Sequence, residues 1–174
     1  MARHEAVFVS SPVDDLENFR ESVRKSLLSL SARFSGRAFL FYMYELHFAD
    51  RMRGPHQNYA EMIVQHCDDG WEETPCTLFI LFFSHRIGNG TRREFELFKE
   101  RFRREEQPVR LWWKKLDTGD DDDPEVADFM EELYEYGEMV PDDSQYDHNN
   151  PVEFGPYVMS ALFQRAMSKK YARR

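Results

Sequence analysis

The stretch Thr77–Glu94, TLFILFFSHRIGNGTRRE, decides the fold. It opens with the almost unbroken apolar run Leu78–Phe83. A run so short and so apolar predicts a strand buried on both faces, which is typical of a parallel sheet covered by helices. The segment Gly88–Gly90 predicts a tight turn, and Thr91 is expected to be the N-cap of the next helix. Ligands of such sheets bind beyond the carboxyl ends of the strands, so we look for chemistry within Ser84–Glu94.

On both sides of this stretch, apolar runs alternate with segments of helical periodicity. Leu16, Phe19 and Val23 recur at three- and four-residue spacing, which predicts a helix with one buried stripe. Because strand, helix and strand follow one another, the strands are expected to pair in parallel through right-handed crossovers. The sequence thus predicts a flavodoxin-like α/β fold, a three-layer sandwich with a four- or five-stranded parallel sheet.

The same pattern places the other elements along the chain. Besides the central run, strands are expected at Ala6–Val9, Ala38–Met43 and Pro108–Trp113. Helices are expected between Asp14 and Gly36, and at Asn58–Gln65, Thr91–Glu105, Pro124–Tyr136 and Pro156–Lys170. The segments Tyr44–Gln57 and Gly137–Pro151 are polar or mixed, and we expect them to be irregular.

Composition limits the possible functions. The chain has 174 residues, of which 41% are hydrophobic, enough for the core of a single domain over residues 1–174. Its formal net charge of -9 argues against general nucleic-acid binding, which needs clustered positive charge. Neither a signal peptide nor an apolar run of roughly 18 residues is recognised, so no membrane span is expected. Cys67 and Cys76 lack disulfide or metal spacing, which favours reduced thiols in a cytoplasmic protein.

Two charged segments have simple interpretations. Arg92–Arg104 concentrates basic residues, and a solvated helix face is the favoured interpretation over a binding patch. Asp117–Asp123 is acidic but lacks the glycine and glutamate of a calcium-binding loop, so we expect a solvated loop. The histidines show no ligand spacing, and no metal site is expected.

Glu94 has two interpretations. With Thr91 it fits a capping box, in which a glutamate three residues after the cap bonds back to the cap's N–H. Alternatively, a carboxylate near a helix start beyond a central strand stays ionised. It can then attack the anomeric carbon of a nucleotide sugar, or stabilise an oxocarbenium-like transition state.

The order of several short motifs resembles the TIR-like domains. These motifs are Val7–Pro12, Asp15–Leu16, Gln57–Asn58, Cys67–Asp68 and, after the apolar strand, Gly90–Phe95. The resemblance is closest to the subgroup that begins V-F-[IV]-S-S and often precedes larger signalling or repeat proteins. Nucleoside 2-deoxyribosyltransferases, whose strand–helix corner carries G-T-x-x-E, are similar more loosely.

The resemblance implies a flavodoxin-like fold and a role for Glu94. In TIR enzymes the matching glutamate cleaves the nicotinamide–ribose bond of NAD, and in deoxyribosyltransferases it is the nucleophile. The implied function is an NAD glycohydrolase acting in signalling or defence, with NAD as substrate, no cofactor, and homo-oligomerisation on activation. TIR enzymes typically have a Trp-Cys pair before the glutamate, where this chain has Arg92 and Arg93. A non-enzymatic self-association module and a deoxyribosyltransferase-like enzyme therefore stay open as alternatives.

Residues at the ends of three predicted strands are expected to bind the substrate. Serine hydroxyls after the first strand can meet a ribose or phosphate, and Arg86 and Arg93 can pair with a pyrophosphate. The expected substrate-binding residues are Ser10, Ser11, Tyr44, Ser84, Arg86, Gly90 and Thr91.

Overall fold

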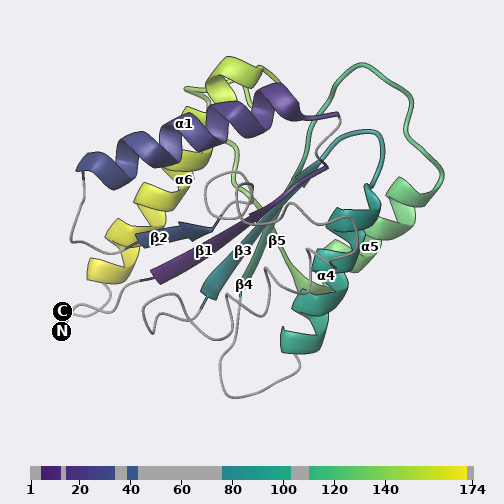
Figure 1. Cartoon of the computed structure of the whole chain (residues 1–174), viewed down its shortest axis with the longest axis horizontal. Helices are drawn as coiled ribbons and strands as arrows, with labels where there is room; N and C mark the ends of the chain where they lie inside the picture. Colours follow the sequence, from purple (N-terminus) through teal and green to yellow (C-terminus); the bar gives the residue numbers. More distant parts are fainter. Residues whose placement is uncertain (1–4, 13–14, 34–38, 43–75, 103–109, 172–174) are drawn as a thin grey trace, which may run out of the picture.

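The computed structural model describes residues 5–12, 15–33, 39–42, 76–102 and 110–171 (Figure 1). Within them the chain forms one five-stranded, all-parallel sheet with helices on both faces. The strands are β1 (Glu5–Ser10), β2 (Phe39–Tyr42), β3 (Cys76–Phe83), β4 (Arg110–Lys115) and β5 (Gly137–Met139). The helices are α1 (Glu17–Arg33), α4 (Asn89–Phe102), α5 (Glu125–Tyr136) and α6 (Pro151–Tyr171). The predicted flavodoxin-like α/β sandwich is therefore confirmed.

The strand order across the sheet is β2-β1-β3-β4-β5. Winding changes direction at β1, which pairs with β2 on one side and with β3 on the other. The register sets Ser10 of β1 beside Leu81 of β3. In an open parallel sheet, ligands bind in the crevice beyond the carboxyl ends of the two strands at such a reversal. We call this place, between the ends of β1 and β3, the switch point.

The two faces of the sheet are covered by different helices (Figure 1). Successive strand residues point to opposite faces, so Phe8 and Phe79 pack with α4 and α5, whereas Val7 and Ile80 pack with α1 and α6. The run Leu78–Phe83 is at most 3% exposed throughout. The prediction that this run is a central strand buried on both faces is thus confirmed.

α1 and α6 touch through a glycine. Gly155 of α6 lies so close to α1 that its N–H donates to Ser22 Oγ at 3.0 Å. A Cβ built on Gly155 would be 2.3 Å from the Ser22 carbonyl oxygen and 2.5 Å from Ser26 Oγ. Because no larger side chain has room there, Gly155 sets the spacing between the two helices.

The prediction that Gly137–Pro151 is irregular was wrong at its start, where β5 lies. β5 is only three residues long, and its middle and last residues are exposed, so it shows no apolar alternation. Its glycine is required by packing, since a Cβ on Gly137 would be 2.6 Å from the Leu111 carbonyl oxygen. The pairing with β4 therefore depends on a close backbone approach, which hydrophobic periodicity does not reveal.

α6 begins at Pro151, five residues before the predicted start at Pro156. Asn150 caps it, because Asn150 Oδ1 accepts the Val152 N–H at 3.0 Å. Pro151 occupies the first helical position, where its missing N–H costs no hydrogen bond. Pro156 instead lies inside the helix. The Asn-Pro-x-Glu sequence ending at Glu153 was the signal for this start.

Several predictions lie outside the described residues. These are the irregular segment Tyr44–Gln57, the helix Asn58–Gln65, and the site residue Tyr44. Among the residues that are described, none of the helices is long and apolar enough to cross a membrane.

Candidate functional site

α4 starts earlier than predicted, and this changes the interpretation of Glu94. The Arg92 N–H donates to the Gly88 carbonyl oxygen at 2.9 Å, so helical bonding begins at Gly88. Thr91 is consequently a buried first-turn residue and not the N-cap, and the first turn holds no acidic residue. The capping-box interpretation was therefore wrong. The prediction failed because the Gly88–Gly90 segment, predicted to be a turn, already forms the start of the helix.

Glu94 instead reaches across to β1. Ser10 Oγ donates a hydrogen bond to Glu94 Oε2, joining residues 84 positions apart. Ser10 is the last residue of β1 and is 1% exposed, and the alternation that turns Phe8 toward α4 turns Ser10 the same way. A hydroxyl bonded to a carboxylate fixes the orientation of both groups. The structure thus brings two predicted site residues together at the switch point.

Ser11 points to the other face of the sheet, where it meets α1. Arg20 Nη1 donates to the Ser11 carbonyl oxygen at 2.8 Å and also to Ser11 Oγ. Both residues are 5% exposed. The Ser11 hydroxyl is therefore bonded to Arg20 in the interior and does not face a ligand. By holding Ser11, Arg20 fixes the end of β1, where the neighbouring Ser10 lies.

Arg20 was missed in the sequence, although a signal was present. Leu16, Arg20, Val23 and Leu27 fall at alternating four- and three-residue spacing. Arg20 therefore occupies a position in the buried stripe of α1, where a charged side chain is unexpected unless it is hydrogen-bonded. A charge within an apolar stripe marks a structural or functional contact, and here the contact is with the end of β1.

Arg86 lies in the connection from β3 to α4 and forms an ion pair with Asp15. Arg86 Nε and Nη2 donate to the two carboxylate oxygens of Asp15, in a fork-to-fork arrangement. Asp15 lies in the connection from β1 to α1, and its side chain is 10% exposed, against 46% for Arg86. The predicted pyrophosphate contact of Arg86 would therefore have to replace this partner.

The connections after β3 and β4 are also joined. Ser84 is fully buried, and its hydroxyl is 3.4 Å from His85 Nδ1. The Asp123 N–H donates to the His85 carbonyl oxygen at 2.7 Å, and His85 Nδ1 is 3.5 Å from Asp120. The acidic loop is exposed, as predicted, but it is fixed to the rim of the site by these contacts.

Arg92, a basic residue near Glu94, packs α4 against α5. Arg92 pairs with Glu132 of α5 at 2.6 Å, and its guanidinium carbon lies 4.4 Å from the centre of the Phe129 ring. Arg92 thus ties α4 to α5. This contact faces away from the sheet's other layer and keeps the helix that carries Glu94 in place.

Gly90 offers a test of ligand approach. A Cβ at Gly90 would meet no atom within 4 Å, so the first turn of α4 has room for alanine. Gly90→Ala should raise the free energy of unfolding by up to about 1 kcal/mol, because alanine loses less backbone entropy in a helix. If NAD is the substrate, as the resemblance implies, and Gly90 allows it to approach closely, the KM for NAD should rise in the same variant. Urea unfolding and steady-state kinetics measure the two effects, and an unchanged KM would remove Gly90 from the binding site.

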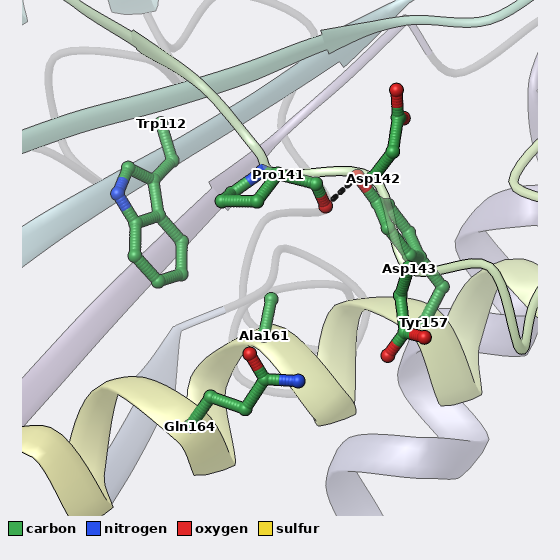
Figure 2. A pocket seen from close by; sticks show the side chains of 7 residues that line it. All are labelled: Trp112, Pro141, Asp142, Asp143, Tyr157, Ala161 and Gln164. Atoms are coloured by element: carbon green, nitrogen blue, oxygen red, sulfur yellow. Dashed lines mark hydrogen bonds between the residues drawn. The ribbon is translucent and has the colours of Figure 1, made fainter.

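A pocket of about 210 Å³ lies on the opposite face of the sheet, between β4, the segment after β5, and α6. Figure 2 shows Trp112 and Tyr157 on opposite sides of it, with Ala161 and Gln164 along α6. The Tyr157 hydroxyl donates to the Val140 and Pro141 carbonyl oxygens, each at 3.1 Å. Burial raises the pKa of Tyr157 above its usual range, so this phenol stays protonated. Sequence reasoning gave no sign of this pocket, and Glu94 takes no part in it.

Beside the pocket, Lys114 is buried and donates to Asp142. The Lys114 hydrogen bond and charge lower the pKa of Asp142, and burial and the Lys114 charge lower the pKa of His148. Both groups bind fewer protons in the folded state, so acidification destabilises the fold. The His148 contribution is lost as pH falls below its unfolded pKa of about 6.5, and the Asp142 contribution as pH falls through its lowered folded pKa.

His148→Gln should therefore reduce the loss of stability between pH 7.5 and about 5.5. Urea unfolding at both pH values measures the difference between wild type and variant. The Asp142 titration lies below this window and serves as an internal reference, because its own loss should begin only at more acid pH. An unchanged pH slope in the variant would contradict the role of His148.

At the switch point, the contacts bring a carboxylate, a hydroxyl and a guanidinium onto two neighbouring connections. This set suits a ligand that carries a sugar and a phosphate, since carboxylates bind ribose hydroxyls and guanidinium groups bind phosphate. Comparison of the chain with known protein families, curated proteins and solved structures gives no match.

Proposed function

We propose that the chain is a TIR-like NAD glycohydrolase that cleaves the nicotinamide–ribose N-glycosidic bond, with Glu94 as the catalytic carboxylate. The observation that supports this most is the Ser10–Glu94 hydrogen bond at the switch point. A glutamate that is oriented by a buried hydroxyl, at the sheet edge where open parallel sheets bind ligands, has a position that suits catalysis. The order of the motifs around it gives the reaction class by resemblance.

The reaction is simple in its proton and electron balance. Nicotinamide leaves as a neutral base and takes the bonding electron pair, because its ring nitrogen is cationic in NAD. The Glu94 carboxylate stabilises the positive charge that develops on the ribose. Water then adds to the anomeric carbon and releases a proton to solvent, giving ADP-ribose. The leaving group needs no general acid, and no cofactor takes part.

The wider setting follows from the same resemblance. TIR-like enzymes act in signalling or defence in the cytoplasm, and assembly into homo-oligomers switches them on. This chain has Arg92 and Arg93 where those enzymes typically have a Trp-Cys pair, and Arg92 pairs instead with Glu132 of α5. By the same resemblance, we propose that self-association activates the chain.

The test is an assay for free nicotinamide. The purified chain is incubated with NAD, at high protein concentration and with a crowding agent, beside the Glu94→Gln variant. Release of nicotinamide by the wild type, with little or none by the variant, supports the proposal. A nucleoside with a free base is assayed in parallel, and base exchange there would favour deoxyribosyl transfer instead. If the wild type releases nothing in any assembled state, the non-enzymatic module is the better interpretation.

A further inference from the structure

Two contacts join the same pair of connections at the switch point. Ser10 and Asp15 belong to the β1–α1 segment, and Glu94 and Arg86 belong to the β3–α4 segment. Ser10–Glu94 is one cross-link, and Asp15–Arg86 is the other. One cross-link therefore holds the carboxylate of the proposed reaction, and the other holds a guanidinium already bound by a carboxylate.

The two connections also approach each other at Gly88 and Pro12. A Cβ built on Gly88 would lie 3.6 Å from Pro12 Cβ, in ordinary van der Waals contact. Pro12 follows β1 and Gly88 follows β3, so the two connections approach each other at these residues and a methyl group on Gly88 would just fill the space between them. The ion pair is thus formed between two connections that lie near each other in the fold.

A phosphate can bind Arg86 with the same geometry as the Asp15 carboxylate does. A guanidinium presents two parallel N–H donors, which bind a carboxylate or a phosphate in the same bidentate manner. Nearly half of the Arg86 side chain is exposed, so an anion from solvent can approach it. Solvent screens the exposed Arg86 end of the pair, and a diphosphate brings more negative charge than a carboxylate.

We infer that Asp15 is a built-in competitor for Arg86, which a nucleotide's diphosphate displaces on binding. Arg86 then favours ligands with a diphosphate over nucleosides that lack one, and Asp15 sets how much of that binding is lost to competition. The inference deepens the proposed function, on whose site it rests, by assigning the diphosphate as the recognised group. It needs no bond cleavage, so binding of ADP tests it separately.

ADP binding is measured by isothermal titration calorimetry on the full chain and on three variants. Asp15→Asn should bind ADP roughly three- to tenfold tighter, because the competing charge is gone while the side-chain shape is kept. Arg86→Gln should bind ADP about tenfold more weakly. In the double variant, the gain from Asp15→Asn should disappear. Affinity for adenosine, which has no phosphate, should be the same in all four proteins.

A control separates this effect from a general change in charge. Glu17→Gln removes one negative charge from an exposed position two residues away and should leave ADP affinity unchanged. Equal or weaker ADP binding by a folded Asp15→Asn variant, or a gain that persists without Arg86, would overturn the inference. Absence of ADP binding in every variant would do the same. If ADP binding follows the expected pattern but NAD is not cleaved, the inference stands and the proposed reaction fails.

Discussion

Glu94→Gln is expected to slow nicotinamide release by about 10² or more, while thermal stability changes little. The glutamine amide oxygen can still accept the Ser10 hydroxyl, so the contact between β1 and α4 is kept. What is lost is the negative charge that, in the proposed reaction, stabilises the ribose cation in the transition state. Initial rates of nicotinamide release and thermal unfolding measure the two quantities on the same preparation.

The matched control is Glu96→Gln, two residues along the same helix. Glu96 pairs with Lys99 at 2.8 Å and has a 40% exposed side chain, so its replacement removes one charge and one partly exposed ion pair away from the Ser10–Glu94 contact. Its rate should equal that of the wild type. Equal rates in wild type and Glu94→Gln would refute the catalytic assignment, and a rate loss in both glutamine variants would point to a general charge effect.

Gly155→Ala is expected to destabilise the fold by about 1–3 kcal/mol, the usual cost of overpacking. Alanine is the better helix former by about 1 kcal/mol, but the added methyl group would be 2.3 Å from a backbone oxygen of Ser22. A backbone atom cannot move aside as a flexible side chain can, so α1 and α6 must separate. The midpoint of urea unfolding measures the loss.

The sign of this change separates packing from propensity. Gly90→Ala, in an open turn of α4, should shift the midpoint upward, and Gly155→Ala should shift it downward. Adding Ser26→Ala removes only the Oγ contact at 2.5 Å and should restore little, because the clash with the Ser22 carbonyl remains. A stabilised Gly155→Ala variant would show that α6 can shift along α1 without cost.

The sequence was sufficient for the fold where a pattern is local. The apolar run Leu78–Phe83 and the spacing of the α1 stripe each report a burial that depends on one element, so both predictions are confirmed. β5 was missed because three residues cannot show a period, and its pairing depends on the absence of a Cβ at Gly137. Periodicity detects faces, and it does not detect close backbone contacts.

The candidate site was predictable in its place but not in its contacts. A central strand followed by glycines indicated the switch point, because the ends of parallel strands share one edge of the sheet. The partners could not be read from the sequence, since Ser10–Glu94 and Asp15–Arg86 join residues 84 and 71 positions apart. Local spacing even favoured Thr91 as the N-cap of α4, although helical bonding begins at Gly88. Arg20 was the exception, because its place in the α1 stripe could have been noticed.

The parallel arrangement of β1 and β3 has a consequence for how the chain folds. Parallel neighbours cannot form a hairpin, and pairing Ser10 with Leu81 closes a long loop whose entropy cost precedes any gain. The four residues of the two cross-links come together only after that pairing. A partly folded chain with intact helices therefore holds none of the geometry of the site, and recovery of ligand binding during refolding should coincide with the slow, long-range step of sheet formation.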